Sequence, residues 1–168
     1  MPRRQTVPRL WLMTDERQGD ALWAALERLP RRSGVVFRHY GLPAAERRLL
    51  FDAVRAVCRR RALVLIAAGG PLSGSRGSHR RRGRGLVTWP AHNLREIRAA
   101  ERAGAHAIFL SPVHPTRSHP GRKALGERRF TLLARRTALP VIALGGMDGK
   151  KFARLRGAYG WAGIDAWD

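Results

Sequence analysis

Short apolar runs alternate with amphipathic stretches along nearly the whole chain. The runs are continuous, a pattern typical of strands that are buried on both faces. Seven of them are readable, at Leu10–Met13, Val35–Arg38, Leu63–Ala67, Leu86–Thr88, Ala107–Leu110, Val141–Leu144 and Trp161–Ile164. Because one run follows another at the spacing of a strand and a helix, the pattern predicts a parallel sheet covered by helices.

The stretches between the runs carry helical periodicity. In 44–59, leucine, alanine and valine recur on one face, and arginine and glutamate occupy the other. In 93–103, Asn93 stands three residues before Glu96, which predicts a capping box at the start of a helix. Weaker patterns predict two further helices, one around Leu22, Trp23 and Leu26 and one around Phe130 and Leu133.

This alternation of strands and helices fits two architectures, a (β/α)8 barrel and an open doubly wound sheet. A barrel needs an eighth strand, which has to lie between Gly69 and Gly85, in a segment of glycine, serine and arginine. The chain has 168 residues, whereas such barrels usually have at least about 200. Neither a linker nor a fixed-period repeat is visible, so we expect one domain over residues 1–168.

The loop 111–121, with the sequence SPVHPTRSHPG, is the first candidate for chemistry. It follows directly on a predicted strand, and active sites of barrels and open α/β sheets lie at the carboxyl ends of strands. Thr116, Ser118 and His119 offer hydroxyl and imidazole donors that a curved loop can direct at one oxyanion. The alternative is a rigid polar loop that binds no ligand.

The second candidate is the segment 144–148, with the sequence LGGMD, where a strand leads into a helix. Gly145 and Gly146 let a backbone approach closely, and a helix start offers unpaired N–H groups to a phosphate. Asp148 has a simpler interpretation as the N-cap of that helix.

Composition excludes several classes of protein. A hydrophobic share of 44% is enough for a packed core, which argues against global disorder. No apolar run approaches the roughly 20 residues of a membrane-spanning helix. The first residues lack the apolar stretch of a signal peptide, so we expect a cytoplasmic protein without membrane association. Cys58 is the only cysteine, which excludes an internal disulfide and a cysteine metal cluster, and we interpret it as a packing residue.

The chain carries 33 lysines and arginines against 12 acidic residues, a formal charge of +21. Such a charge attracts nucleic acid, and its densest cluster is the stretch 76–84. We favour the alternative, in which arginine is spread over the solvated outer faces of helices. The positions that fit this interpretation are 47, 48, 55, 59, 60, 61, 95, 98, 102, 128, 129, 135, 136, 154 and 156.

Four segments together resemble the thiamine-phosphate synthase/TenI family. They are LWLMTDE at 10–16, the run from VTWPAHNLREI to AIFLSPV at 87–113, the loop SPVHPTRSHPG, and ALGGM at 143–147. The resemblance implies a TIM barrel. It also implies an enzyme that joins a thiazole phosphate to a hydroxymethylpyrimidine pyrophosphate and releases pyrophosphate, with Mg²⁺ and basic groups holding the departing charge. Members of the TenI branch instead tautomerise a thiazole phosphate by acid–base chemistry.

The resemblance assigns roles to six residues. Thr116 and Ser118 match hydroxyl positions of the family's phosphate-gripping loop, and His119 takes the place of a lysine that stabilises pyrophosphate. Gly145 and Gly146 match the thiazole-phosphate loop. The sixth residue is Arg38, which matches the arginine of the family's Gln-x-Arg-x-Lys strand motif.

Other positions depart from the family pattern. In the Gln-x-Arg-x-Lys motif, Val36 replaces the glutamine and Tyr40 the lysine. Ala67 and Ala68 replace an Asn-Asp pair, so a pyrimidine contact and a magnesium-binding carboxylate are missing, and we expect no metal site. Three further replacements occur at the mouth: Pro90 for a serine, Pro112 for the tautomerase histidine, and Asp165 for a phosphate-binding serine.

The fourth unit also departs, because the family's second acidic metal contact gives way to Arg80, Arg81 and Arg82. These arginines offer bidentate contacts to pyrophosphate without Mg²⁺; the alternative is a solvated loop. We therefore expect a shortened TIM barrel with a degenerate fourth βα unit and no last helix, which binds a small phosphorylated thiazole. The alternatives are a catalytically degenerate phosphate-binding or regulatory relative and a basic nucleic-acid-binding module. The sequence does not indicate the oligomeric state.

Overall fold

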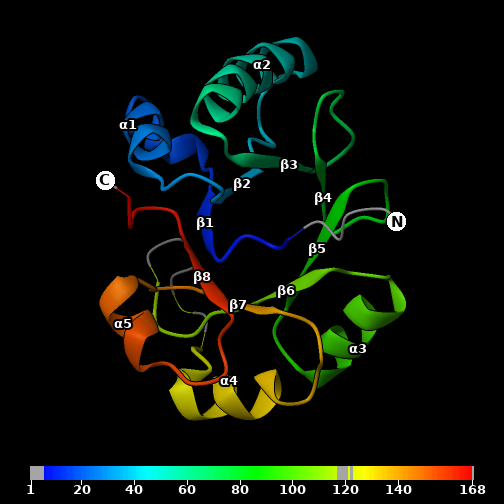
Figure 1. Cartoon of the computed structure of the whole chain (residues 1–168), viewed down its shortest axis with the longest axis vertical. Coiled ribbons are helices and arrows are strands. Elements are labelled where there is room, and N and C mark those ends of the chain that lie inside the picture. The colour runs from blue at the N-terminus through cyan, green and yellow to red at the C-terminus, as the bar shows by residue number, and fades with distance from the viewer. Residues whose placement is uncertain (1–5, 117–120, 122, 168) are drawn as a thin grey trace.

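The computed structural model describes residues 6–116, 121 and 123–167. Its strands are all parallel, they pair in chain order, and the last returns to the first, so the sheet closes into a barrel (Figure 1). The strands are β1 Leu10–Met13, β2 Gly34–Phe37, β3 Val64–Ala68, β4 Gly77–His79, β5 Leu86–Ala91, β6 Ala107–Leu110, β7 Val141–Leu144 and β8 Gly160–Gly163. Closure confirms the TIM barrel and excludes the open sheet.

The helices lie outside the ring of strands (Figure 1). They are α1 Ala21–Arg28, α2 Ala44–Arg61, α3 Leu94–Arg102, α4 Gly126–Ala134 and α5 Gly149–Arg154, with a short 3-10 turn at Glu16–Gln18. In α2, Phe51, Val54 and Cys58 face the barrel. Of the leucine, alanine and valine positions that the periodicity placed on the apolar face, Val54 is buried as predicted, whereas Leu49 is 71% exposed, so the buried face is rotated from the predicted one. Burial raises the pKa of the Cys58 thiol to about 12, so this residue packs and does not react. Across the described part of the chain, no helix is long and apolar enough to span a membrane.

The predicted start of α3 is confirmed in a modified form. The Asn93 side chain accepts a hydrogen bond from the Glu96 N–H at 2.9 Å, as an N-cap does. The Glu96 carboxylate, however, accepts a hydrogen bond from the backbone N–H of His92 at 2.7 Å, not from that of Asn93. The cap therefore begins one residue earlier in the chain than a capping box does. It includes His92, which directly follows Ala91 at the end of β5.

The fourth βα unit is reduced to a strand alone. Strand β4 lies within the segment between Gly69 and Gly85, and within that segment no helix follows it before β5. A Cβ on Gly77 would lie 2.0 Å from the Leu86 carbonyl oxygen, so only glycine admits this pairing. The prediction of a degenerate fourth unit is confirmed. Residues 164–167, the described residues beyond β8, contain no helix either.

Strand β5 runs three residues beyond its predicted end and includes Pro90. Proline has no N–H for a sheet ladder, so it is tolerated only where a strand has no neighbour to bond. Thr88 points its carbonyl to the β4 side, where it accepts from Arg80 N–H at 2.8 Å. The backbone nitrogen of Pro90, two residues after Thr88, also faces the β4 side. At that level β4 has already ended, because its last residue, His79, pairs with Thr88. The early end of β4 therefore accommodates the proline.

Large side chains fill the inside of the barrel. Trp11 and Phe109 are fully buried, with ring centroids 5.2 Å apart in an edge-to-face arrangement. The His79 ring packs edge-on against Phe109 at 5.3 Å. Two further apolar clusters lie between the barrel and its helices. Because the lumen is packed, the barrel offers space for ligands at its ends, as in other barrels of this architecture.

Candidate functional site

The carboxyl ends of the strands surround a cavity of about 880 Å³. Its wall contains Arg38 after β2, Arg80 after β4, Thr116 after β6, and Gly145 and Gly146 after β7. Active sites of TIM barrels are built from these loops. The structure thus brings together residues that the sequence singled out in four separate segments.

Some predicted site residues do not join this group. Arg81 and Arg82 are exposed and do not line the cavity, and Arg82 donates to the Arg102 carbonyl at the end of α3 at 2.9 Å. Ser118 and His119 lie outside the described residues. Of the arginine triplet, only Arg80 is placed at the mouth.

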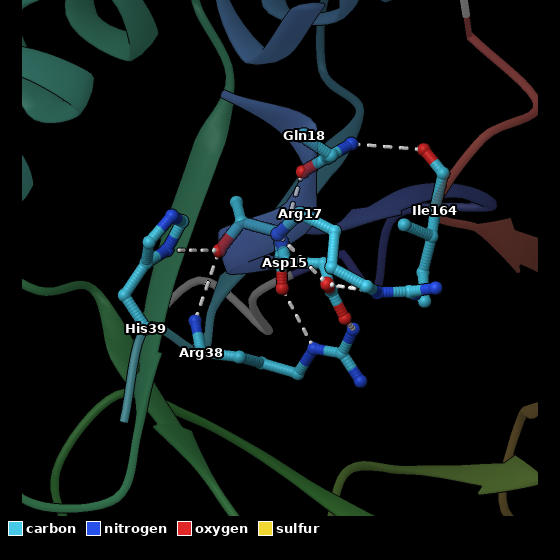
Figure 2. A network of polar contacts seen from close by, with 7 residues as sticks. Asp15, Arg17, Gln18, Arg38, His39 and Ile164 are labelled. Carbon is cyan, nitrogen blue, oxygen red and sulfur yellow. Dashed lines mark hydrogen bonds and ion pairs between the residues drawn. The ribbon is translucent and has the colours of Figure 1, made fainter. Parts of the chain in front are cut away.

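Arg38 is held in position by the loop after β1. Its Nε donates to the Thr14 carbonyl at 2.8 Å, and its Nη2 pairs with Asp15 Oδ2 at 3.1 Å (Figure 2). Burial lowers the pKa of the Arg38 guanidinium, and the Asp15 carboxylate opposes that shift. For Asp15, burial raises the pKa, but the hydrogen bonds from Arg17 and the charges of Arg17 and Arg38 outweigh it and lower the pKa overall. Arg38 is therefore a preorganised cation in the cavity wall.

The same polar network ties three strand ends together (Figure 2). Thr14 Oγ1 accepts from the Arg38 N–H at 3.0 Å and contacts His39 Nδ1 at 3.0 Å. Gln18 accepts from the Asp15 N–H at 2.9 Å and donates to the Ile164 carbonyl beyond β8 at 3.0 Å. Sequence reasoning missed this network. The one local sequence pattern that indicates it is Asp15 followed three residues later by Gln18, which is the spacing of a capping box.

A cation lies where the resemblance expects an acidic metal ligand. Arg47 Nε donates to the His39 carbonyl at 2.8 Å, and its Nη2 donates to the carbonyl of Ala68, the last residue of β3, at 2.5 Å. The interpretation of Arg47 as part of a solvated helix face was wrong, because it is half-buried against two strand ends. Among the residues that the structure describes, no three His, Cys, Asp or Glu side chains gather to hold a metal. At the two places where the resemblance expects acidic magnesium ligands, the chain has Ala68 and Arg80.

Tyr40 replaces the expected lysine and lies among these cations. Its ring packs over Gly69, where a Cβ would come within 2.6 Å of the ring. Burial raises the pKa of the Tyr40 hydroxyl, although the charges of Arg38, Arg47 and Arg80 all act to lower it. The hydroxyl consequently stays protonated at neutral pH and is a hydrogen-bond donor within a group of guanidinium ions.

His79 lies in the cavity wall as a neutral residue. It is 8% exposed, and its Nδ1 lies 2.9 Å from Thr88 Oγ1. Burial, assisted by the charges of Arg38 and Arg80, lowers the pKa of His79 to about 3. The imidazole therefore contributes a hydrogen-bonding group and no positive charge to the mouth.

This neutral histidine predicts a loss of stability in acid. Unfolded His79 binds a proton below about pH 6.5 whereas the folded residue does not, so acid favours the unfolded chain. Between about pH 7.5 and pH 5 the free energy of unfolding is expected to fall by about 2 kcal/mol on account of His79. Urea unfolding at both pH values measures this. His39, whose pKa is also lowered by burial, acts in the same direction in parent and variant alike. A His79→Gln variant with the same acid loss as the parent would contradict the assignment.

Two loops form the opposite wall by direct backbone contact. The Val113 N–H donates to the Leu144 carbonyl at 2.9 Å, and the His114 N–H donates to the Gly145 carbonyl at 3.1 Å. A Cβ on Gly145 would lie 2.8 Å from Pro112 Cα, and the Gly145 φ of 97° also disfavours any side chain. The glycine pair thus fixes the loop that carries Thr116 against the loop after β7.

Two charged residues that the sequence left ambiguous are placed at this wall. Asp148 caps α5, since its Oδ1 accepts from the Lys151 N–H at 2.8 Å. Lys151 Nζ in turn donates to the Gly146 carbonyl at 2.6 Å and lines the cavity. Asp165 also lines the cavity. The mouth is cationic beside β2 to β4 and mixed in charge beside β7 and β8.

Comparison with known proteins links this site to a family. A family profile described as thiamine monophosphate synthase matches residues 77–167. Over 81 residues the chain is 38% identical to a protein of Aquifex aeolicus (strain VF5) named "Putative thiamine-phosphate synthase 2". That match covers 47% of this chain and 44% of the relative, so the chain matches less than half of that protein's length.

Solved structures confirm the barrel. A thiamine phosphate pyrophosphorylase from Pyrococcus furiosus superposes with a TM-score of 0.78 at 20% identity, covering 94% of this chain and 86% of that one. A structure titled "Native KDPGal structure" superposes with a TM-score of 0.59 at 15% identity, covering 96% of this chain and 84% of the other. At these identities the likeness concerns the fold.

Proposed function

The chain belongs to the thiamine monophosphate synthase family, and on that premise we propose that its barrel mouth binds a thiazole phosphate. The observation that carries the proposal is the convergence of Arg38, Arg80, Thr116, Gly145 and Gly146 on one cavity. About 880 Å³ is a volume typical of small-molecule sites. Since phosphorylated intermediates do not cross membranes freely, we place this function in the cytoplasm.

The phosphate group is proposed to sit between Thr116 and the glycine pair. The carbonyls of Leu144, Gly145 and Gly146 already accept hydrogen bonds from Val113, His114 and Lys151. In a trans peptide the N–H points opposite to its carbonyl. The N–H groups of Gly145 and Gly146 thus point away from Val113 and His114, and they are proposed as donors to an oxyanion in the cavity that Thr116 also lines.

The thiazole ring is proposed to rest on the apolar part of the wall. Ring and methyl groups gain about 25 cal/mol for each Å² of apolar area removed from water. The apolar side chains that line the cavity come from several strand ends, and they are Met13, Trp89, Leu144, Met147 and Ile164. A cavity with phosphate donors at one end and apolar side chains at the other suits a small aromatic phosphate.

A second candidate function, the full transferase reaction, rests on the cationic side. Arg38, Arg80 and the Tyr40 hydroxyl offer donors for a departing pyrophosphate. The Arg47 contact to the Ala68 carbonyl, where the family keeps a metal ligand, favours binding without catalysis. Complementation of a thiamine-auxotrophic bacterium separates the two, because growth requires turnover, whereas soluble folded protein that fails to support growth is a binding relative.

Calorimetry with hydroxyethylthiazole phosphate tests the proposed binding. We expect a saturable heat, equal with and without EDTA, because Ala68 and Arg80 stand where the resemblance expects acidic metal ligands. Heat that requires added Mg²⁺ contradicts the metal-free account, and the absence of heat contradicts the function. A short single-stranded RNA that binds instead, with affinity falling steeply with salt, supports the nucleic-acid alternative.

Asp165→Ser is expected to tighten thiazole-phosphate binding about fivefold. A carboxylate a few ångströms from a phosphate opposes binding by about 1 kcal/mol in a water-exposed site. Asp165 lines the cavity, and serine restores the residue type that the family resemblance implies there. The matched control is Glu46→Ser on the outer helix α2, which also removes one exposed negative charge and is expected to change affinity less than twofold. Equal effects of both variants would contradict a local role for Asp165.

A further inference from the structure

A second hollow opens at the opposite end of the barrel. It has a volume of about 600 Å³ and is lined by residues 6–10, 30–33, Arg76 and Tyr159, with Val64 and Leu86 beneath. Most of these residues directly precede β1, β2, β4 and β8, so they surround the amino ends of the strands. The hollow is therefore separate from the mouth, and nothing in the proposed thiazole-phosphate site explains it.

The charge around this hollow is of one sign. Arg9, Arg31, Arg32 and Arg76 line it, and no acidic residue does. None of the ion pairs between described residues involves these arginines. Arg9 alone is fixed, with its Nε on the Tyr159 carbonyl at 2.8 Å and its guanidinium 5.1 Å from the Tyr159 ring. Uncompensated cations around a concave surface raise the local concentration of anions.

Ser33 places a hydroxyl at the same hollow. Ser33 is 3% exposed. Its backbone is satisfied, because its N–H donates to Pro30 at 3.1 Å and its carbonyl accepts from Val64 at 2.8 Å. Its side-chain oxygen is not among the fully buried polar atoms that lack a partner in the described part of the chain, so it is open to the hollow and can donate a hydrogen bond there. An oxyanion in the hollow would accept this hydrogen bond.

The remaining wall is apolar and held in place. The backbone around residues 6–9 is pinned by the Tyr159 hydroxyl on the Val7 carbonyl at 2.9 Å and by Trp11 Nε1 on the Pro8 carbonyl at 2.7 Å. Figure 1 shows this segment crossing the end of the barrel before it enters β1. The apolar side chains include Val7, Pro8, Pro30, Val64 and Leu86. The hollow thus combines a preformed apolar bed with a cationic rim.

We propose that this hollow binds an organic phosphate, with its apolar or aromatic body on the bed and its phosphate on Ser33 and the arginines. A phosphate dianion matches several guanidinium ions better than a carboxylate does, and guanidinium pairs with it bidentately. A volume of about 600 Å³ suits a small molecule. This site is independent of the thiazole-phosphate site at the mouth.

The turn at Pro30–Ser33 supplies a variant that removes charge without loss of folding. The Ser33 N–H closes the turn on the Pro30 carbonyl, and Arg32 occupies its third position with φ 69°. Glycine is preferred at this position and conformation. Arg32→Gly is therefore expected to keep or raise the melting temperature while it removes one rim cation.

Amide NMR of the full chain, titrated with naphthyl phosphate, tests the site. We expect saturable shifts at Ser33, Arg76 and Tyr159, and at least a tenfold weaker affinity in Arg32→Gly and in Ser33→Ala. Arg128→Ala, an exposed charge on α4, is the control and is expected to change affinity less than twofold.

Three outcomes would overturn the proposal. They are shifts confined to Thr116 and Gly145 at the mouth, equal weakening by Arg128→Ala, and displacement of naphthyl phosphate by a short single-stranded RNA that binds more than tenfold tighter. Because the readout is resolved by residue, a failure here leaves the mouth proposal untouched, and a failure at the mouth leaves this one untouched.

Discussion

Replacing Phe109 by alanine is expected to lower the free energy of unfolding by about 3–5 kcal/mol. The ring is fully buried, lies 5.2 Å from the Trp11 ring and supports the His79 ring at 5.3 Å. Removal of the ring leaves a cavity between rigid strands that cannot close around it. Chemical denaturation of parent and variant at neutral pH measures the difference.

The matched control is Leu132→Ala on α4. Leu132 is 57% exposed, so its truncation removes little buried surface and is expected to change stability by less than about 0.5 kcal/mol. If Phe109→Ala cost no more than this control, the barrel lumen would not be packed as described. The floor of the mouth would then lack the support that holds His79.

Replacing Arg80 by glycine is expected to weaken pyrophosphate binding at the mouth about thirtyfold. A charge-assisted hydrogen bond contributes about 1.5–3 kcal/mol, and about 2 kcal/mol corresponds to this factor. Arg80 has φ 62°, a left-handed conformation that glycine adopts without strain, so the variant is expected to fold at least as stably as the parent. Isothermal calorimetry with inorganic pyrophosphate, in the presence of EDTA, gives the affinity.

Arg81→Gly is the matched control for this variant. Arg81 is the next residue, carries the same charge, and does not line the cavity. Its loss is expected to change affinity less than twofold. Equal weakening by both variants would mean that pyrophosphate senses the overall charge of the loop, and the assignment of Arg80 to the mouth would be wrong.

The strands that sequence patterns predicted are those whose apolar runs are continuous. Val141–Leu144 and Ala107–Leu110 were placed with correct bounds because both faces of each strand are buried. Strand β4 is Gly-Ser-His, with no apolar run of its own, and it exists through its pairing with β3 and β5. The end of β5 at Ala91 was missed because a proline is unfavourable in a strand unless its neighbour has already ended.

The residues around the mouth likewise fall into those that lie in local sequence motifs and those that do not. Thr116, Gly145 and Gly146, which line the cavity, could be singled out from the sequence because each lies in a local motif after a predicted strand. Arg47 and Thr14 were not found, because their roles depend on contacts between segments that are distant in sequence. Arg47 stands 21 residues before Ala68, whose carbonyl it binds, and Thr14 stands 25 residues before His39. On the sequence alone Arg47 is indistinguishable from the other arginines of its helix.

Mapping of hydroxyethylthiazole phosphate by amide NMR, in the presence of EDTA, tests whether the mouth binds it without a metal. Metal-free binding at the mouth predicts saturable shifts at Thr116, Gly145, Gly146 and Lys151, which line one cavity at the carboxyl ends of the strands. It also predicts that added Mg²⁺ changes neither the affinity nor the set of shifted residues. Shifts that are absent from this wall, or that arise only when Mg²⁺ is added, would contradict it.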